Sequence, residues 1–132
     1  MCERFMVVTP DETLQSIMNK FQLANVHNLA VVDEGKLIGE ISDKYVSLAV
    51  SPFVNTAAEQ HRDVQTLHKH VHQIMNRHVT TLAVDDELDS AVAMMLERDI
   101  SWLPVVDSEM HLVGVLSYVD ILRDMVGFPK LV

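Results

Sequence analysis

The sequence predicts a mixed α/β fold of the α+β type: two β-α-β-β-α units packed sheet to sheet around a pseudo-two-fold axis and joined by a helical linker. Two observations predict this fold. A shift of 74 positions aligns residues 8–33 with residues 82–107, and seven of these 26 positions are identical. Both copies also show helical spacing followed by short apolar runs. The chain therefore contains a duplicated unit that is too small to bury its apolar face alone.

The first helix of each copy is predicted by apolar residues at positions i, i+3, i+4 and i+7, which form one helical face. These residues are Leu14, Ile17, Met18 and Phe21 in the first copy, and Leu88, Ala91, Val92 and Met95 in the second. Asp11 and Asp85 precede these stretches. Because a carboxylate can accept hydrogen bonds from the free N–H groups of a first helical turn, both are the expected caps.

Two short strands are predicted after each helix, because short apolar runs bounded by turn residues are typical of buried strands. They comprise residues 29–32 and 37–41 in the first copy and residues 103–106 and 112–116 in the second. Pro104 suits the first residue of its strand, where no N–H is needed. A closing helix follows in each copy and is expected to end at Ser51-Pro52 in the first and at Gly127 in the second.

The segment between the copies has helical spacing of its own, because Val64, Leu67, Val71 and Ile74 recur at intervals of three and four residues. This pattern predicts that the linker is mostly an amphipathic helix. The expected organisation is a first motif over residues 1–50, a helical linker over residues 51–74 and a second motif over residues 75–132.

Composition and charge exclude several functions. The net charge of −9 disfavours binding to nucleic acid or to an anionic membrane surface. No apolar run reaches the roughly 18 residues that a membrane span needs, and no signal segment opens the chain. The single cysteine, Cys2, cannot support a disulfide framework. A cytoplasmic protein is therefore expected.

The strand–turn–strand stretches read HNLAVVD–GKLIGEIS in the first copy and SWLPVVD–HLVGVLSYVD in the second. In these stretches the chain resembles a tandem pair of cystathionine β-synthase (CBS) domains, the Bateman module, of the stand-alone bacterial type. The resemblance covers almost the whole chain. It implies a regulatory ligand-sensing module, not an enzyme, that binds an adenosine derivative in the cleft between the motifs. The implied ligands are AMP, ADP, ATP and S-adenosylmethionine, with no catalytic cofactor and no metal ion.

The ribose-binding signature of the resembled family is a glycine, an apolar residue, any residue, a serine or threonine, any two residues and an aspartate. The second copy matches it with Gly114, Ser117 and Asp120, whereas the first has Glu40 at the apolar position and Tyr45 at the acid. A carboxylate can accept hydrogen bonds from both hydroxyls of a ribose, and a helix N-terminus favours phosphate. One cleft is therefore expected to bind a nucleotide, and the other is expected to be lost or altered.

The resemblance also nominates residues that contact the adenosine ligand. They are Met6, Val7, Val26, His27, Asn28, Ser101, Trp102, Pro104, Ser117 and Asp120. In such pairs the acid of one copy often works with the adenine wall of the other, which implies that Asp120 faces the first-copy residues, Phe5 included. If this crossed arrangement does not occur, the pocket is lined instead by Thr80, Thr81, Ile100 and Pro104.

Other interpretations stay open for some of these features. Ser117 and Asp120 also form a helix-capping pattern, and Trp102 is as well suited to pack between sheets as to stack on a base. His61, His68 and His72 share one face of a linker helix, and His68 and His72 are spaced as a workable metal pair. A solvated linker face is the favoured interpretation of these histidines.

Two classes of function remain, a ligand sensor and a scaffold with degenerate sites that dimerises or docks on a regulated partner protein. The complete signature ending at Asp120 favours the sensor, and Tyr45 favours the scaffold. An enzyme is not expected, because no nucleophile and base can be assembled. A homodimer is expected, because the helices supply more apolar surface than one face needs. The residues behind this expectation are Phe21, Met94, Leu96, Ile121, Leu122 and Met125.

Overall fold

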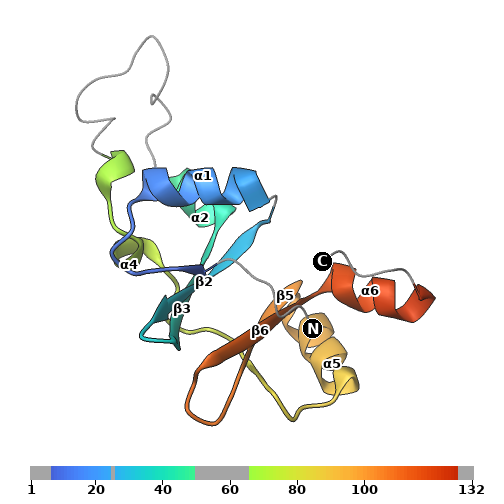
Figure 1. Cartoon of the computed structure of the whole chain (residues 1–132). Coiled ribbons are helices and arrows are strands. Elements are labelled where there is room, and N and C mark those ends of the chain that lie inside the picture. Colours follow the sequence, from blue (N-terminus) through green and yellow to red (C-terminus); the bar gives the residue numbers. More distant parts are fainter. Residues whose placement is uncertain (1–6, 25, 50–65, 128–132) are drawn as a thin grey trace. The chain divides into compact units, whose positions relative to one another are not determined.

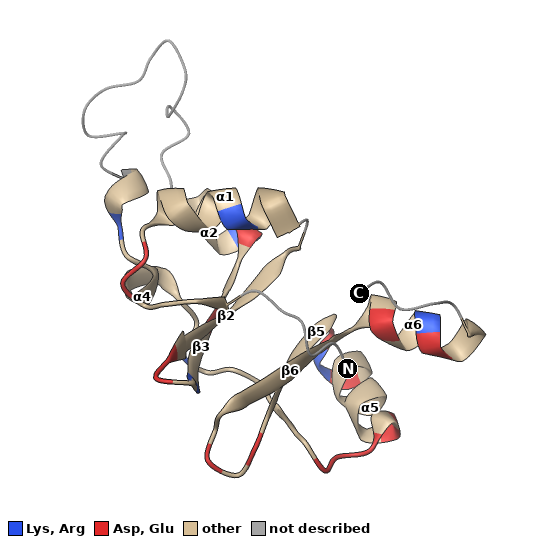
Figure 2. Ribbon diagram, in the orientation of Figure 1, with Lys and Arg blue, Asp and Glu red and all other residues tan. Residues whose placement is uncertain are grey.

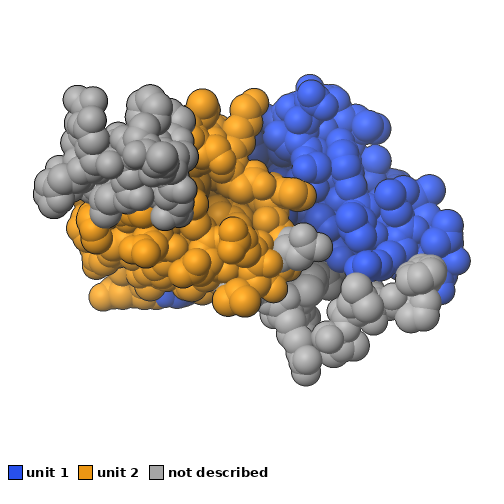
Figure 3. Space-filling model, turned by 90° about the horizontal axis from the view of Figure 1, so that it is seen from above, with its two compact units in different colours: residues 1–5, 35–37, 80–132 blue, residues 6–34, 38–79 orange. Residues whose placement is uncertain are grey.

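The structure is a computed structural model that describes residues 7–24, 26–49 and 66–127 (Figure 1). It contains two three-stranded sheets, each accompanied by helices, so the α+β class predicted from the repeat is confirmed. The described residues fall into two compact units (Figure 3). We call residues 7–24, 26–34, 38–49 and 66–79 the N-terminal unit and residues 35–37 with 80–127 the C-terminal unit.

The first sheet has the strand order β1-β2-β3 and is accompanied by two helices. The elements are β1 (Val7–Val8), α1 (Leu14–Ala24), β2 (Asn28–Asp33), β3 (Lys36–Ser42) and α2 (Asp43–Ala49). β1 runs parallel to β2, with Val8 opposite Val31. Parallel neighbours need a crossover connection, and α1 supplies it. The first copy thus has the β-α-β-β-α order that the repeat predicts.

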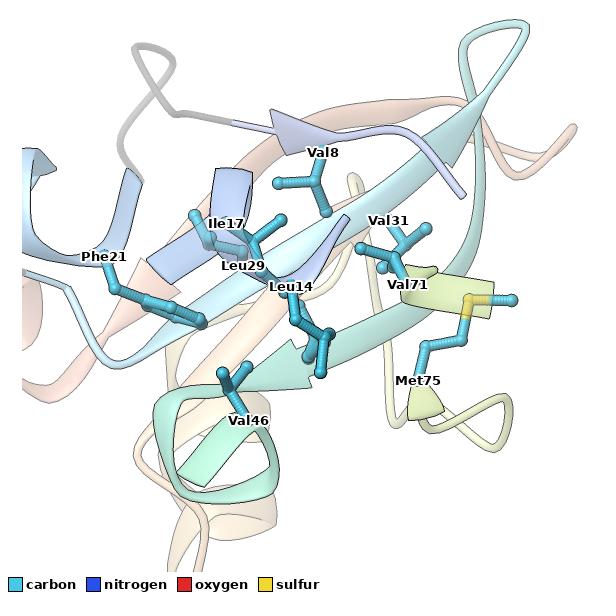
Figure 4. Close-up of a cluster of buried hydrophobic side chains, with 10 residues drawn as sticks. Val8, Leu14, Ile17, Phe21, Leu29, Val31, Val46, Val71 and Met75 are labelled. Carbon is cyan, nitrogen blue, oxygen red and sulfur yellow. The ribbon is translucent and has the colours of Figure 1, made fainter. Parts of the chain in front are cut away.

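The apolar face predicted for α1 points into the core of the N-terminal unit (Figure 4). Leu14, Ile17 and Phe21 are buried, and Met18 packs against them. The same cluster contains Val8, Leu29, Val31, Ile41, Val46, Val71 and Met75. Each fully buried aliphatic or aromatic side chain stabilises the fold by about 1.5–3 kcal/mol, so this face holds α1 on its sheet.

The second sheet repeats this arrangement with the strand order β4-β5-β6. The elements are β4 (Leu82–Ala83), α5 (Leu88–Arg98), β5 (Trp102–Val106), β6 (Leu112–Ser117) and α6 (Tyr118–Val126). The central strand β5 pairs in parallel with β4 and antiparallel with β6. Its core contains Leu82, Ala91, Met95, Leu103, Val105, Leu116 and Ile121. As predicted, α6 ends at Gly127, whose φ of 69° suits a glycine.

The helix caps predicted from the sequence are wrong. Thr13 Oγ1 accepts a hydrogen bond from the Ser16 N–H at 3.3 Å, so Thr13 rather than Asp11 caps α1. Glu87 precedes α5 and makes no side-chain capping bond, and Asp85 lies further upstream. A cap at either aspartate would start the helix at the next residue. Both helices begin two residues after that position, because the chain forms a turn at each aspartate.

The position predicted for Pro104 is also wrong, because Pro104 is the third residue of β5 rather than the first. It is fully buried and lies opposite Val115 of β6. On the other side of β5, β4 pairs only with Val105 and Val106. Pro104 therefore has no β4 partner to which an N–H would donate, which explains how a proline is tolerated inside the central strand.

The linker, predicted to be mostly an amphipathic helix, is not one helix in the part that the structure describes. A 3₁₀ turn covers Thr66–His68, and α4 covers only Val71–Ile74. Leu14 N–H donates to the Lys69 carbonyl and Val71 N–H donates to the Glu12 carbonyl, both at 2.9 Å. These tertiary hydrogen bonds replace helical ones, although Leu67 and Val71 are buried as their spacing predicts. The predicted stop at Pro52 lies outside the described residues, and the expected motif and linker boundaries stay a prediction.

The break in the linker also separates the histidines that share a face in a continuous helix. The His70 ring donates a hydrogen bond to the Asp11 carbonyl at 2.9 Å and stacks on His72, with ring centroids 5.5 Å apart. His68 belongs to the 3₁₀ turn, and His61 lies outside the described residues. Within the described segments, no group of three or more potential metal ligands comes together.

Apolar side chains remain exposed on helices of the C-terminal unit. Leu96, Leu122 and Met125 are 71%, 60% and 73% exposed, in line with the excess apolar surface expected from the sequence. Phe21 and Ile121 do not contribute to that excess, because both are buried, and Met94 packs against the C-terminal core. None of the helices in the described ranges is long and apolar enough to cross a membrane.

Glu12 ties the start of α1 to the strand before it. Its carboxylate accepts a hydrogen bond from the Thr9 N–H at 2.7 Å and pairs with the Lys20 ammonium at 2.6 Å. Lys20 also donates to the Val7 carbonyl at 3.2 Å. Burial alone would raise the pKa of Glu12, but the hydrogen bonds from Lys20 and Thr9 and the charge of Lys20 outweigh burial and lower it from 4.5.

Replacing Glu12 by glutamine is therefore expected to lower the free energy of unfolding by about 0.5–1 kcal/mol at neutral pH. The pKa of Glu12 is lower in the folded state than in the unfolded state. The carboxylate therefore adds to the free energy of unfolding at a pH above the unfolded-state pKa, and this contribution is lost as the pH falls through the folded-state pKa. Urea unfolding at neutral and acidic pH measures the gap in the free energy of unfolding between wild type and variant. The gap should shrink in acid, whereas that of the exposed-site control Gln15→Ala should not. A gap for Glu12→Gln that is independent of pH would contradict the assignment.

Candidate functional site

Ser117 and Asp120 cap the N-terminus of α6 reciprocally. Ser117 Oγ accepts a hydrogen bond from the Asp120 N–H at 3.4 Å. Asp120 Oδ2 accepts hydrogen bonds from the N–H and the hydroxyl of Ser117, both at 3.1 Å. The capping role that the sequence allows for this pair is confirmed.

Only one oxygen of the Asp120 carboxylate takes part in the cap. None of the described residues donates a hydrogen bond to Oδ1, and the side chain is half-buried. The cap fixes the orientation of the carboxylate and leaves Oδ1 able to accept a hydrogen bond from a ligand hydroxyl. Capping and ligand binding are therefore compatible at Asp120.

The pairing of β5 with β6 brings two further candidate residues to this end of the C-terminal unit. Trp102 lies opposite Ser117 in the strand register. The Ser101 carbonyl accepts a hydrogen bond from the Tyr118 N–H at 3.1 Å. Ser101 is exposed and Trp102 is half-buried. The predicted residues Ser101, Trp102, Ser117 and Asp120 are thus brought together around the start of α6.

The residues of the alternative pocket lining differ in their exposure. Thr80 and Thr81 are half-buried, whereas Ile100 packs against the C-terminal core. Pro104 is fully buried, so in this structure it supports β5 from within rather than offering surface to a ligand. The Thr80 hydroxyl accepts a hydrogen bond from Arg98 at 3.4 Å, which places a cation there that the sequence reasoning missed.

In the N-terminal unit, His27 is held by Asp43, the first residue of α2. The Asp43 N–H donates to the His27 carbonyl at 3.0 Å, and His27 Nδ1 lies 2.7 Å from Asp43 Oδ2. Because a carboxylate only accepts, Nδ1 must carry the proton in this contact. Ser101 and Tyr118 make the same backbone contact in the second copy. Ser101 and Tyr118 occupy the positions of the second copy that match His27 and Asp43. This correspondence was the sequence signal for the contact between His27 and Asp43, which was not predicted.

The remaining first-copy candidates occupy separate positions in the N-terminal unit. Asn28 begins β2 and is half-buried, Val7 begins β1 and is half-buried, and Val26 is exposed. Met6 and Phe5 lie outside the described residues. Val7, Val26 and Asn28 belong to a different compact unit from Asp120 (Figure 3), and the crossed site stays a prediction.

The first-copy signature keeps the helix cap but not the acid. The Tyr45 N–H donates to Ser42 Oγ at 3.1 Å, which matches the contact between Asp120 and Ser117. Tyr45 is partly exposed and offers a phenol where the second copy has a carboxylate. At the position that matches Asp120, α2 therefore presents a phenol and no carboxylate.

Glu40 has a structural function in the first copy that explains its departure from the signature. Glu40 and Asn76 exchange two backbone hydrogen bonds of 2.9 Å, and Asn76 Nδ2 donates to Glu40 Oε1 at 2.9 Å. The segment around Met75 and Asn76 thus lies against β3. Sequence reasoning missed this contact, because it joins positions 36 residues apart.

An open groove of about 310 Å³ lies between α1 and α2 of the N-terminal unit. Phe21 and Val46 are buried at its base, and the His27–Asp43 pair lies at its edge. Its lining consists of Met18, Phe21, Gln22, Val26, His27, Asp43, Val46 and Ser47. The groove was not predicted from the sequence, because it depends on how two helices pack.

Two copies of a β-α-β-β-α unit, each with a capped helix after a glycine-containing strand, define a tandem CBS pair. The chain belongs to the CBS domain family, whose pattern matches residues 1–51 and 71–127. The resemblance inferred from the two repeated stretches is thereby confirmed.

The chain is similar to the uncharacterized protein MJ1225 of Methanocaldococcus jannaschii, with 29% identity over 118 residues. This match covers 89% of the chain, which spans only 42% of that curated relative. The crystal structure of MJ1225 matches with a TM-score of 0.83 and 26% identity, covering 95% of this chain and 45% of the other.

Two further solved structures are similar to this chain. The cytosolic domain of the Mg²⁺ channel MgtE in complex with ATP has a TM-score of 0.72 and 25% identity, covering 91% of this chain and 44% of the other. CBSX2 in complex with AMP shares the fold, with a TM-score of 0.78, 22% identity and coverage of 96% and 91%.

Proposed function

We propose that this chain is a regulatory module that binds an adenosine nucleotide and has one dominant site, anchored by Asp120. The observation that carries the proposal is the geometry of the α6 N-terminus, where the cap orients the carboxylate and leaves Oδ1 without a described partner. A charge-assisted hydrogen bond from a ribose hydroxyl to such an oxygen contributes about 1.5–3 kcal/mol.

The family supports the same kind of ligand. In the solved structures MgtE holds ATP and CBSX2 holds AMP, and both share the fold of this chain. Tyr45 takes the place of the acid in the first copy, and the ring of His27 is already paired with Asp43. The first copy therefore offers no carboxylate at the position that matches Asp120, and the carboxylate at the start of α2, that of Asp43, is bound to His27.

The proposed module works as a homodimer, and ligand binding changes its shape or its contact with a regulated protein. Exposed apolar side chains on α5 and α6 support dimerisation, because apolar patches beyond a few hundred Å² are uncommon on monomers. Light scattering behind size exclusion tests the dimer. A mass near 30 kDa is expected from the chain mass of 14.9 kDa, and a mass near 15 kDa would refute it.

Isothermal calorimetry with AMP, ADP, ATP, NADH and S-adenosylmethionine tests the nucleotide proposal. Saturable binding of one adenosine nucleotide per chain is the expected result. If none of the five compounds binds, the nucleotide proposal fails, and the scaffold function that the Tyr45 substitution also favours takes its place.

In the same experiment, AMP is expected to bind at least as tightly as ATP when no Mg²⁺ is present. The reason is electrostatic: the chain carries 10 Lys and Arg against 19 Asp and Glu, so each added phosphate charge enters an unfavourable field. Mg²⁺ should reduce the difference, because it neutralises part of the triphosphate charge. A large preference for ATP in the presence of a chelator would contradict this expectation.

A further inference from the structure

The segment that contains α4 brings two histidine rings together. His70 and His72 stack with ring centroids 5.5 Å apart and with planes 6° from parallel. Both side chains are exposed, whereas Val71 between them is buried in the N-terminal core. The sequence spacing suggested His68 as the partner of His72, but the break in the linker places His70 beside His72 instead. The two rings thus meet at the surface on a segment that is fixed to the core.

The ring of His70 is held in one tautomer. Its Nδ1 lies 2.9 Å from the Asp11 carbonyl oxygen, and because a carbonyl only accepts, Nδ1 carries the proton. In the neutral ring the other nitrogen, Nε2, then has a free lone pair. Histidines that bind metal ions usually donate their second ring N–H to a carbonyl or carboxylate in this way, because the bond orients the ring and raises the basicity of the ligating nitrogen. His70 therefore has the orientation and the tautomer of a metal ligand.

The distance between the two rings suits one shared ion. Zinc binds a histidine nitrogen at about 2.0–2.1 Å, so two rings on one ion have centroids about 5–6 Å apart, as these rings do. Stacked rings do not aim both Nε2 atoms at one point, so one ring has to turn. None of the described residues makes a hydrogen bond to the ring of His72, whose backbone alone is bonded. A rotation of this exposed side chain is enough to complete the pair.

The backbone beneath the pair is anchored to the residues that precede α1. His72 N–H donates to the Pro10 carbonyl at 3.1 Å, and Val71 N–H donates to the Glu12 carbonyl at 2.9 Å. The stretch that accepts these bonds carries the acids Asp11 and Glu12, which are drawn in red beside α4 in Figure 2. An ion bound to the pair would therefore strengthen a connection between two distant segments of the N-terminal unit.

The chemistry of the pair selects the class of ion. Imidazole nitrogens suit Zn²⁺, Ni²⁺ and Cu²⁺, whereas Mg²⁺ and Ca²⁺ prefer oxygen ligands. In the described ranges no third protein ligand joins the two histidines, so water has to complete the coordination. Arg77 donates to the His72 carbonyl at 3.1 Å and places a positive charge near the pair. Binding in the micromolar range, rather than tighter, is therefore expected.

We propose that His70 and His72 bind one divalent transition-metal ion, such as Zn²⁺, through their Nε2 atoms. The bound ion secures the α4 segment to residues 10–14 and stabilises the N-terminal unit. Its function is structural or regulatory, because two protein ligands on an exposed segment provide no enclosed reaction site. The proposal does not depend on the nucleotide site at Asp120 or on the homodimer.

Calorimetry with ZnCl₂ in a buffer free of chelators tests the site. The whole chain is used in a Cys2→Ser background, because a thiolate also binds Zn²⁺. His72→Gln removes one proposed ligand, and His78→Gln is the matched control, since His78 is an exposed histidine six residues away. One ion per chain is expected, with affinity at least about 10-fold weaker in His72→Gln and unchanged in His78→Gln. Equal affinity of wild type and His72→Gln, or an equal loss in both variants, would overturn the proposal.

Urea unfolding with and without Zn²⁺ separates a folded site from chelation by histidines of the unfolded chain. An ion that binds only the folded state raises the urea midpoint, whereas binding to the unfolded chain reduces this effect. The midpoint should rise with Zn²⁺ for the Cys2→Ser protein and for His78→Gln, and should not change for His72→Gln. A midpoint that Zn²⁺ leaves unchanged in the Cys2→Ser protein would also overturn the proposal. Neither result bears on the calorimetry with AMP, so the nucleotide proposal stands or fails separately.

Discussion

Replacing Asp120 by alanine is expected to weaken AMP binding about 10- to 100-fold. The variant removes the Oδ1 that the cap leaves without a partner, together with the negative charge that strengthens a hydrogen bond from a ribose hydroxyl. Calorimetry of wild type and variant under identical salt conditions gives the ratio of dissociation constants. Affinities that agree within error would show that Asp120 only caps α6.

Two further variants separate ligand binding from helix capping. Asp120→Asn keeps a side-chain oxygen that can accept from the Ser117 N–H but loses the charge, so it should keep most of the stability and lose most of the affinity. Asp124→Ala removes an exposed acid from the same helix and should leave the affinity unchanged. An equal loss of affinity in Asp124→Ala would mean that helix charge, rather than a specific contact, determines binding.

Replacing Gly39 by alanine is expected to lower the free energy of unfolding by about 1–3 kcal/mol. A Cβ at this position would lie 2.8 Å from Met75 Sδ and 3.0 Å from the Asn76 carbonyl oxygen. The methionine can move in part, but the carbonyl belongs to backbone that is hydrogen-bonded to Glu40. Urea unfolding of wild type and variant measures the loss.

A double-mutant cycle with Met75→Ala identifies the source of that loss. Truncating Met75 removes the sulfur that the new methyl group would meet, so the double variant should be more stable than the sum of the two single effects predicts. Simple additivity would assign the loss to the Asn76 backbone alone. A Gly39→Ala variant as stable as wild type would show that the segment does not pack against β3 as described.

The sequence was most informative where one helix or strand contains all the interacting residues. The spacing of Leu14, Ile17 and Phe21 predicted which face of α1 is buried, because burial selects one side of a periodic element. The reciprocal cap between Ser117 and Asp120 was also predictable, because two residues three positions apart suffice to form it. The family assignment followed from the same local patterns, repeated twice.

The features that the sequence did not predict depend on contacts between distant segments. Thr13 caps α1 where Asp11 was expected, because the path of the preceding turn decides which residue reaches the first free N–H groups. The linker helix is interrupted because residues 69–72 bond to residues 10–14, and apolar spacing carries no information about such bonds. The contact between His27 and Asp43 likewise joins the residue before β2 to the first residue of α2.

The hydrogen bonds of the segment around α4 have a consequence for where the duplicated halves can be separated. Val71 and Met75 complete the hydrophobic core of the first copy, and Asn76 pairs with the outer strand β3. A fragment cut at residue 50, at the end of the first repeat, would lack all three residues and would leave an open cavity beside Leu14 and Val31. A fragment that retains these contacts must therefore extend at least to Asn76. The predicted end of the first repeat and the end of the segment that completes its core therefore lie at different places in this chain.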